Sequence, residues 1–379
     1  MRKKRRLWYP LLLFILICIF FTACEQTPTR QSDSINTDHT NSSSITGTME
    51  IHFLDVGQGD CTLIQCDGQT MLIDAGNNDK ANDVRDYLIS KGITQLNYVI
   101  GTHPDADHVG GLDVVIDTFD CQTIFMPNRT SNTRTYQDVI QSMQMRNETN
   151  TTPVVGTTYT LGSASFTIIA PNSNDYGENT NDYSIGILLQ HGENRFLFTG
   201  DAEEHAEQDM MQNGIDLSAD VYKAAHHGSR TASTSAFLDA VHPTYAIISC
   251  GENNRYGHPH AQTLNEFRAR GIQVFRTDEQ GTIVATSNGS VIQWNMSPSD
   301  SWQSGEPTGS SIISTTQALA APANESISTT YILNIQTKKF HLPTCHHALN
   351  TNTENKQVTT ASREQLIQDG YHPCGSCNP

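Results

Sequence analysis

Basic residues are scarce in this sequence, and so are long apolar segments. The 379 residues include 23 Lys and Arg against 40 Asp and Glu, a formal net charge of −17 at pH 7. Sequence-independent affinity for nucleic acid comes from Lys and Arg that neutralise phosphates, so the chain is a poor general binder of nucleic acid. A phosphate-bearing substrate must therefore be held locally, by metal. The apolar 36% of the chain is divided into runs separated by Gly-containing turns, which predicts a folded core and excludes a multi-helix transmembrane channel.

The first residues are unlike the rest of the chain. Arg2 to Arg6 are all basic, and an apolar run follows from Leu11 to Phe21. This pattern predicts a secretory signal over residues 1–23, because the apolar run is short for crossing a bilayer. A single membrane-spanning anchor is the alternative. Residues 1–23 hold five basic and no acidic residues, so the exported chain carries 18 basic and 40 acidic residues, a net charge of −22.

The end of the signal, Phe21-Thr22-Ala23-Cys24, resembles a bacterial lipobox. This resemblance implies that Cys24 is lipidated and anchors the protein to the cytoplasmic membrane, at the cell surface. Free secretion is the alternative.

Two polar tracts divide the exported chain. Residues 24–48 are rich in Ser, Thr, Asn and Asp and cannot offset the entropy of ordering, which predicts a disordered tether. Residues 295–330 are rich in Ser, Thr, Ala and Pro and predict a linker. The expected folded parts are therefore a main domain over residues 49–294 and a small module over residues 331–379.

Within residues 49–294, short apolar strands alternate with amphipathic helices. This order predicts an α/β fold whose sheets are covered on their outer faces by helices. Four of the nine cysteines lie in these apolar runs and are expected to be ordinary core residues, namely Cys61, Cys66, Cys121 and Cys250.

One strand of this domain runs directly into a cluster of potential metal ligands. The apolar segment 98–101 is followed by Thr102-His103-Pro104-Asp105-Ala106-Asp107-His108. Histidine supplies neutral nitrogen and aspartate supplies hard oxygen, a mixture that suits zinc, manganese or iron. The alternative is an acidic turn with two incidental histidines.

Two further strands end in residues of the same kinds. The segment 196–199 leads into Gly200-Asp201, and the segment 221–224 leads into Ala225-His226-His227. Each alone is a weak signal, since Gly-Asp is common in turns and paired histidines are common on surfaces. Three such strand ends in succession predict one shared metal site.

Together these segments resemble the metallo-β-lactamase superfamily, and within it the nuclease-like domain of the ComEC DNA-uptake proteins. The resemblance covers residues 49–294 and rests on the segments His52–Asp60, Leu72–Gly76, His103–Gly111, Thr199–Asp201, His226–Ser229 and Tyr256–His260. It implies a four-layer αββα sandwich with metals at one edge.

The resemblance also implies a ligand set. His103 and Asp105 would hold one metal, Asp107 and His108 the other, and Asp201 would bridge both. One of His226 and His227 would complete the second site, and Asp74 would orient a ligand or its loop. Asp105 stands where the superfamily commonly has His, and no additional His precedes Asp201, so the first site is expected to be poor in nitrogen. More oxygen favours a harder metal, which makes manganese an alternative to zinc.

Two metals about 3.5 to 4 Å apart activate a bridging water and stabilise charge on a phosphoryl or carbonyl oxygen. The expected catalytic residues are Asp107, His227, Lys223 and His258. Asp107 would help to hold the hydroxide, and Lys223 and His258, with Ser229 and His260, are candidates for binding substrate or protonating the leaving group. The alternatives are an exposed lysine and a simple turn beside Pro259.

The C-terminal module has its own metal-like spacing. His341 and Cys345 form one close pair, and Cys374 and Cys377 form a second. One imidazole and three thiolates suit a tetrahedral structural zinc, and disulfide pairing is the alternative. The two segments resemble the metal-binding domain of the Ada DNA-repair protein, but His341 replaces its methyl-accepting Cys. This implies zinc-stabilised binding, of nucleic acid for example, without methyl transfer.

The leading hypothesis is an exported phosphodiesterase or nuclease that acts on DNA at the cell surface and supports DNA uptake. A second hypothesis keeps the site but takes a cell-envelope phosphoester, such as phosphocholine on teichoic acid, or a lactone. A third is a non-catalytic surface protein that binds nucleic acid. We expect a monomer that contacts DNA or envelope components and the membrane.

Overall fold

The computed structural model describes residues 47–306, 330–343, 345, 348, 351–361 and 363–374. The chain divides into two compact units, within residues 1–310 and 311–379. The predicted signal, Cys24, most of the tether and Cys377 lie outside the described residues. Among the residues that are described, no helix is long and apolar enough to cross a membrane.

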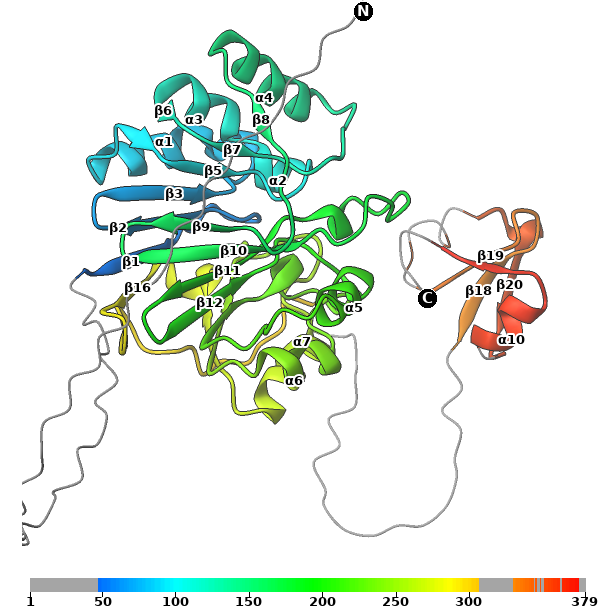
Figure 1. Ribbon diagram of the computed structural model, residues 1–379. Coiled ribbons are helices and arrows are strands. Elements are labelled where there is room, and N and C mark those ends of the chain that lie inside the picture. The colour runs from blue at the N-terminus through cyan, green and yellow to red at the C-terminus, as the bar shows by residue number, and fades with distance from the viewer. Residues whose placement is uncertain are drawn as a thin grey trace, which may run out of the picture. The chain divides into compact units, whose positions relative to one another are not determined.

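The first unit contains a mixed eight-stranded sheet in the order β17-β16-β1-β2-β3-β5-β7-β8. Neighbours are antiparallel from β17 to β3, and parallel from β3 to β8. The strands are β1 (Met49–Phe53), β2 (Thr62–Cys66), β3 (Gln69–Ile73), β5 (Tyr98–Ile100), β7 (Ile124–Phe125), β8 (Asn150–Thr151), β16 (Ile283–Ser287) and β17 (Ile292–Trp294). Helices α1 (Ala81–Ser90), α3 (Leu112–Thr118) and α4 (Arg134–Met145) cover its outer face (Figure 1).

A second, seven-stranded sheet has the order β15-β14-β13-β12-β11-β10-β9. Its strands from β12 to β15 are parallel, and the others are antiparallel. They are β9 (Thr158–Leu161), β10 (Ala164–Ala170), β11 (Gly186–His191), β12 (Asn194–Phe198), β13 (Val221–Lys223), β14 (Tyr245–Ile248) and β15 (Gln273–Arg276). Helices α5 (Glu204–Gln212), α6 (Ser235–Val241) and α7 (Ala261–Ala269) lie on its outer face (Figure 1).

Three apolar cores separate the four layers. The central core lies between the sheets and includes Phe53, Phe166 and Phe196. The outer cores join each sheet to its helices. Cys61, Cys66, Cys121 and Cys250 are free and buried, as expected for core residues. The predicted αββα sandwich is confirmed.

Short elements occupy the connections between these layers. They are β4 (Gln95–Leu96), β6 (Asp120–Cys121), α2 (Ala106–Val109), α8 (Thr277–Gln280) and the 3-10 helices η1 (Asn78–Lys80), η2 (Asn181–Tyr183) and η3 (Ala225–Gly228). Helix α2 and the turn η3 lie within predicted ligand segments.

The main domain extends beyond its predicted boundary at residue 294. Residues 295–306, assigned from the sequence to the linker, pack against the first unit. Ser299 donates its backbone N–H to the Val274 carbonyl at 2.7 Å, and Trp302 packs on the outer core. Glu306 pairs with Arg230. Composition alone misplaced this boundary because a few specific contacts order an otherwise polar segment.

The second unit is a small four-stranded sheet in the order β20-β18-β19-β21 with one described helix, α10 (Arg363–Gln368). Its remaining elements are β18 (Tyr331–Asn334), β19 (Lys339–His341), η4 (Thr353–Asn355), β20 (Lys356–Thr359) and β21 (His372–Pro373). Its small apolar core contains Tyr331, Leu333, Phe340 and Leu366.

Candidate metal centre

The predicted ligands of the main domain gather where parallel strands of both sheets end. Asp74 follows β3, and the segment from His103 to His108 follows β5. From the other sheet, Asp201 follows β12, and the His226-His227 pair follows β13. The carboxyl ends of parallel strands leave loops at one edge of a sheet, so two packed sheets bring these four segments together.

Glycine lets the loops approach closely enough to form this centre. Gly200 has a φ of +53°, and a Cβ there would lie 2.9 Å from the Ser184 hydroxyl and from Thr102. Gly59 has a φ of +149°, and its Cβ would lie 2.4 Å from the Asp107 carbonyl. Backbone without a side chain is therefore required beside both Asp201 and Asp107.

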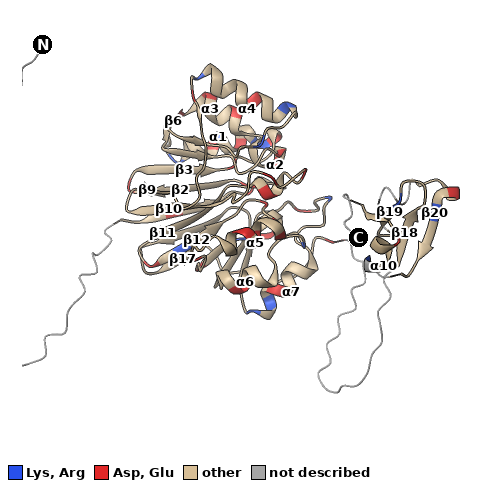
Figure 2. Ribbon diagram, turned by 45° about the vertical axis from the view of Figure 1, so that its right-hand side comes forward, with Lys and Arg blue, Asp and Glu red and all other residues tan. Residues whose placement is uncertain are grey.

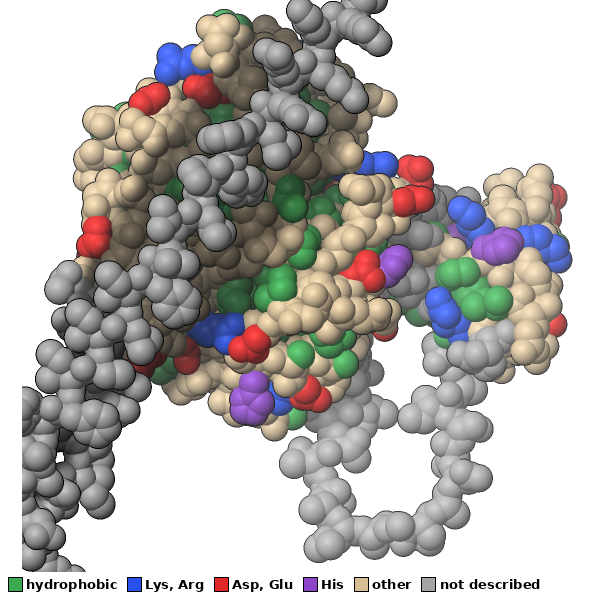
Figure 3. All heavy atoms as spheres, viewed as in Figure 1, with side chains coloured by type: hydrophobic (Ala, Val, Ile, Leu, Met, Phe, Trp, Pro, Cys, Tyr) green, Lys and Arg blue, Asp and Glu red, His purple; other side chains and the backbone are tan. Residues whose placement is uncertain are grey.

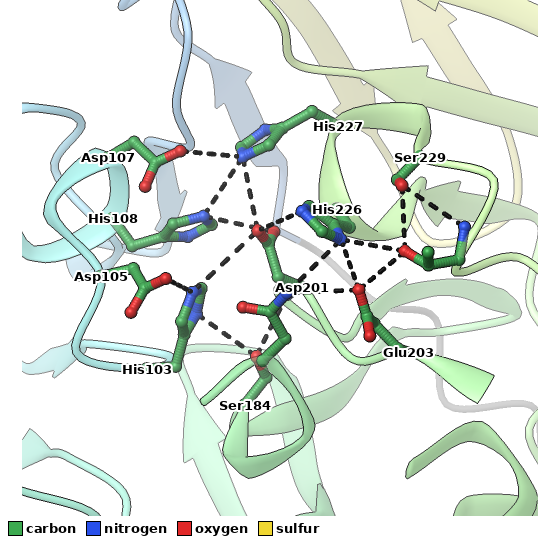
Figure 4. A network of polar contacts seen from close by, with 12 residues as sticks. His103, Asp105, Asp107, His108, Ser184, Asp201, Glu203, His226, His227 and Ser229 are labelled. Atoms are coloured by element: carbon green, nitrogen blue, oxygen red, sulfur yellow. Dashed lines mark hydrogen bonds and ion pairs between the residues drawn. The ribbon is translucent and has the colours of Figure 1, made fainter. Parts of the chain in front are cut away.

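The His108 ring is oriented by Asp74. The Nδ1–H of His108 donates to Asp74 Oδ2 at 2.8 Å, since a carboxylate can only accept. Asp74 also accepts hydrogen bonds from the Thr102 backbone N–H and hydroxyl, each at 2.8 Å. In the neutral ring the lone pair is therefore on Nε2, and this atom lies 3.2 Å from Asp201 Oδ1 (Figure 4).

His227 is held in the same way from the opposite side. Its Nδ1–H donates to the Ser249 carbonyl at 2.9 Å and lies 3.2 Å from Asp60 Oδ1. Its Nε2 lies 3.3 Å from Asp107 Oδ2 and 3.5 Å from Asp201 Oδ2. The Nε2 atoms of His108 and His227 face each other at 3.3 Å.

His103, which follows β5 of the eight-stranded sheet, also faces the Asp201 carboxylate. Its Nδ1 lies 3.2 Å from the Thr102 hydroxyl and 3.3 Å from the Ser184 hydroxyl. The Thr102 hydroxyl donates its hydrogen bond to Asp74, so its oxygen accepts the hydrogen bond from the Nδ1–H of His103. The Nε2 of His103 lies 3.9 Å from Asp105 Oδ2 and 4.0 Å from Asp201 Oδ2 (Figure 4).

His226 and His227 are adjacent in sequence, but their rings take different positions. Both have left-handed backbone, with φ of 49° and 55°. The Nδ1–H of His226 donates to Glu203 Oε1 at 3.0 Å, and its Nε2 lies 3.8 Å from Asp201 Oδ2. His227 therefore lies with Asp107 and His108, whereas His226 reaches Asp201 from another side (Figure 4).

This donor set fits two divalent metals. All four rings have Nδ1 held by an oxygen acceptor, which directs their Nε2 lone pairs toward Asp201. The buried His103 Nε2 and Asp201 Oδ1 make no hydrogen bond among the described residues. Two overlapping clusters have ligand atoms within 4.8 Å of one another, His103-His108-Asp201 and Asp107-His108-His227.

A fourth imidazole, that of His226, lies near Asp201. The sequence predicted a first site poor in nitrogen, with only His103 and two carboxylates. The His226 Nε2 lies 3.8 Å from Asp201 Oδ2, but His226 is in neither of the two clusters whose ligand atoms lie within 4.8 Å of one another. The two clusters share His108, and the division of the donors between two metals stays a prediction.

When no metal is bound, the neighbouring carboxylates raise the pKa values of His227 and His108. Burial by itself lowers the pKa of His227, but Asp201, Asp107 and Asp60 outweigh it and raise the pKa to about 10. For His108, Asp201 and Asp74 likewise overcome burial and raise the pKa well above its usual value. A metal that binds at these nitrogens displaces protons, and its affinity therefore depends on pH.

Lys223 is not where the sequence analysis placed it. The side chain is 2% exposed, and its ammonium pairs with Asp60 Oδ2 at 2.8 Å and donates to the Ala224 carbonyl at 3.2 Å. It lies behind the His227 ring, so both the predicted substrate contact and the exposed alternative are wrong. Burial opposes ionisation of Asp60, but Lys223 and His227 hold its pKa at about 2.

His258 is also buried. Its ring centroid lies 5.3 Å from that of His226 and 5.9 Å from that of His227. Burial, followed by the charges of His227 and His226, lowers its pKa to about 2. His226 and His227 carry these charges only while no metal is bound to them, so the predicted role of His258 in binding substrate or protonating the leaving group stays a prediction. Ser229 is likewise buried, and its hydroxyl bonds to that of Thr231.

Several residues of the centre were missed by the sequence analysis. Asp60 supports His227 and Lys223, Glu203 orients His226, and Ser184 lies between His103 and the Asp201 backbone N–H. Only Asp60 stands within a segment that carries the family resemblance. Glu203 and Ser184 are ordinary residue types whose roles depend on contacts between distant segments.

The C-terminal unit brings three of its four predicted zinc ligands together. His341, Cys345 and Cys374 are buried and offer ligand atoms within 4.8 Å of one another. The Nδ1 of His341 lies 3.6 Å from Cys345 Sγ. The fourth predicted ligand, Cys377, is outside the described residues.

Comparison with known proteins gives a consistent result. The profile of the Metallo-beta-lactamase superfamily matches residues 54–252. ComE operon protein 3 of Bacillus subtilis is 29% identical over 252 residues, which are 62% of this chain and 32% of that protein. Recombination protein 2 of Haemophilus influenzae is 29% identical over 241 residues, 62% of this chain and 28% of that protein.

The chain therefore spans about a third of the length of these curated relatives. Among solved structures, the metallo-beta-lactamase fold protein YhfI of Bacillus subtilis aligns with 65% of this chain and 99% of its own, at 11% identity and a TM-score of 0.42. The family profile covers more than half of the chain, including the segments that carry His103, Asp201 and His227. The chain belongs to the metallo-beta-lactamase superfamily and is similar, in its main domain, to ComEC-like competence proteins.

Proposed function

We propose that this protein is an exported, metal-dependent phosphodiesterase that acts on DNA at the cell surface. The observation that carries the proposal is the convergence of four imidazole Nε2 atoms on Asp201, with Asp105 and Asp107 beside them. Bound there, two divalent metals would activate a water and stabilise charge that develops on a phosphoryl oxygen.

The chain's own residues supply position and charge. Asp74, Glu203 and the Ser249 carbonyl hold three of the rings in the tautomer that leaves Nε2 free. The mixed oxygen and nitrogen donors suit zinc or manganese. Asp105 and Asp107 also line an open pocket, so a substrate can reach the centre from solvent.

The choice of DNA as substrate is supported by the relatives' names, which refer to competence and recombination. The acidic surface opposes general binding of DNA. On the face shown in Figure 3, Lys and Arg side chains of the described residues appear singly or in small groups rather than as a stripe. Recognition of phosphates must therefore occur at the metal centre and its immediate rim.

The proposal extends to the other parts of the chain. Lipidation at Cys24 would hold the protein at the outer surface of the membrane, with residues 25–47 as its tether. A structural zinc held by His341, Cys345, Cys374 and Cys377 would close the C-terminal unit, whose core is too small to be stable alone. That unit would bind a partner, with nucleic acid as the first candidate.

The test is a comparison of substrates with the purified exported chain. Linear DNA, circular DNA, bis-p-nitrophenyl phosphate, a phosphocholine ester and a lactone are each offered with manganese, with zinc and with chelator. We expect metal-dependent cleavage of the phosphodiesters. Linear and circular DNA distinguish attack at ends from internal attack. Turnover of the lactone or the phosphocholine ester without phosphodiester cleavage would overturn the proposal in favour of that substrate.

Asp201→Ala separates an enzyme from a binding protein. Loss of the carboxylate shared by both donor groups should abolish hydrolysis and lower the metal content, while binding of a partner by the C-terminal unit persists. Asp86→Ala, which removes an exposed carboxylate on α1, is the matched control. DNA binding with no hydrolysis in the unsubstituted protein would favour a non-catalytic role.

A further inference from the structure

The wall of the active-site pocket contains an arginine and a tyrosine that the metal centre does not use. Arg255 and Tyr256 line the pocket together with Asp105 and Asp107. Arg255 is exposed, and Tyr256 is 48% exposed. Arg255 is the only Lys, Arg or His among the described residues that line this pocket.

The guanidinium is joined to the metal centre by a series of stacked side chains. Its Cζ lies 4.9 Å from the centroid of the Tyr256 ring, and its Nη2 donates to the Tyr256 hydroxyl at 2.7 Å. The Tyr256 ring stacks on His258, with centroids 5.6 Å apart and planes 18° apart. His258 in turn packs against the rings of His226 and His227. This arrangement makes the buried His258 ring the support on which Tyr256 packs.

The backbone that carries Arg255 is also held in place. The Asn254 side chain accepts hydrogen bonds from the backbone N–H groups of Tyr256 at 3.2 Å and His258 at 3.0 Å. Its amide donates to the carbonyls of Gly251 at 2.9 Å and His258 at 2.6 Å. An exposed arginine on an ordered turn loses less freedom when it binds than one on a mobile loop.

Arg255 has unused binding capacity. A guanidinium has five N–H donors in a planar fork that matches phosphate oxygens, and Tyr256 takes one of them. No described carboxylate lies within ion-pair distance of it. Acidic residues are distributed over the outer helices α5 to α7 (Figure 2). Because Arg255 is the only Lys, Arg or His among the described residues that line the pocket, a phosphate chain that reaches it meets few other cations.

We propose that Arg255 binds a second phosphate of the substrate, in the same pocket as the metal centre, with Tyr256 holding its guanidinium in place. This inference rests on the proposed function and specifies its substrate class. The protein prefers a chain with consecutive phosphodiesters, an oligonucleotide, to an isolated phosphodiester. Arg255 acts on substrate affinity and on selection among phosphodiesters.

The experiment compares two substrates and four variants of the exported chain loaded with metal. Bis-p-nitrophenyl phosphate has one phosphate, whereas a short oligothymidylate has several, and both are measured for kcat and KM. The variants are Arg255→Ala, Arg255→Lys, Tyr256→Phe and Arg268→Ala. The last is the matched control, because Arg268 is an exposed arginine over an aromatic ring, 4.8 Å from Trp302, on α7 and outside the pocket lining.

In Arg255→Ala we expect the ratio of kcat/KM for the oligonucleotide to that for bis-p-nitrophenyl phosphate to fall about tenfold, through KM. The slope of log KM for the oligonucleotide against log salt should decrease by about 0.7, as for loss of one phosphate contact to a single strand. Arg255→Lys should restore the salt slope but only part of the ratio, since a point charge lacks the planar fork. Tyr256→Phe should lower the ratio by a smaller factor, and Arg268→Ala should change neither quantity.

An unchanged ratio and salt slope in Arg255→Ala would overturn the inference while leaving the proposed phosphodiesterase intact. A decrease of the same size in Arg268→Ala would also overturn it, because the effect would then be one of overall charge. If the unsubstituted protein cleaves no phosphodiester, the proposed function fails and this inference fails with it.

Discussion

Asp74→Asn is the sharpest test of how the metal centre is organised. Asp74 has a left-handed backbone, with φ of 59°, which Asn adopts as readily as Asp. The substitution is also isosteric. It therefore replaces one carboxylate oxygen by an amide and leaves the chain path unchanged.

The expected magnitude follows from the three hydrogen bonds that the carboxylate accepts. The donors are His108 Nδ1, the Thr102 backbone N–H and the Thr102 hydroxyl, each at 2.8 Å. If the amide NH₂ of the introduced Asn takes the place of Asp74 Oδ2, it faces the Nδ1–H of His108, and two donors then oppose each other. The conflict is relieved only if His108 changes tautomer and accepts a hydrogen bond through Nδ1. That tautomer carries its proton on Nε2, which can then no longer bind a metal.

We expect metal affinity to fall about 10- to 100-fold, or about 1.4 to 2.8 kcal/mol. A buried donor left without an acceptor costs a further ~1–3 kcal/mol of folding stability, which is measured separately. Affinity is determined by competition with a chromophoric chelator, and stability by urea denaturation of the metal-free protein. Asp86→Asn, exposed on α1, serves as the control. Metal affinity within twofold of the unsubstituted protein would refute the view that Asp74 sets the tautomer of His108.

Three further predictions concern two buried side chains of the main domain and the C-terminal unit. Lys223→Met should lower the free energy of unfolding by about 3–5 kcal/mol, because it leaves the buried Asp60 unpaired. Urea denaturation measures this change. Unchanged stability together with a raised KM would instead support the predicted contact of Lys223 with substrate. Burial raises the pKa of Glu207 from 4.5 to about 7 despite hydrogen bonds from Ser233 and Thr234. As pH rises, the Glu207 carboxyl loses its proton in the unfolded chain before it does so in the folded protein. The free energy of unfolding should therefore fall by up to about 3 kcal/mol between pH 4.5 and 7. Denaturation at several pH values measures this slope, which Glu207→Gln should remove. Cys374→Ser should remove one zinc per chain and keep the metals of the main domain, as elemental analysis with Asp201→Ala for comparison will show.

The sequence was a good guide to the centre where the signal is local. An apolar strand followed at once by His and Asp is visible in a single segment, and three such segments predicted the gathering of His103, Asp107, Asp201 and His227. The αββα layers were implied by the family resemblance, whose motifs are also local, whereas apolar periodicity alone predicted sheets covered by helices.

The sequence was a poorer guide where burial decides the role of a residue. Lys223 and His258 are polar residues beside ligand motifs, and their residue types suggested contact with substrate. In the structure both are enclosed, Lys223 by Asp60 and His258 by the neighbouring rings. A sequence gives no direct measure of the space around a side chain, and that space determines which charges are stable.

The sequence by itself determined that this protein has a His- and Asp-rich metal centre at the ends of apolar strands, because the ligand types and their strand context are contiguous in the chain. Only the tertiary structure decided how the ligand rings are oriented. It placed Glu203 against His226, Ser249 against His227 and Asp74 against His108, pairs that come from separate segments. The direction of a ring nitrogen depends on the acceptor that its other nitrogen meets, and that acceptor is chosen by packing of the two sheets.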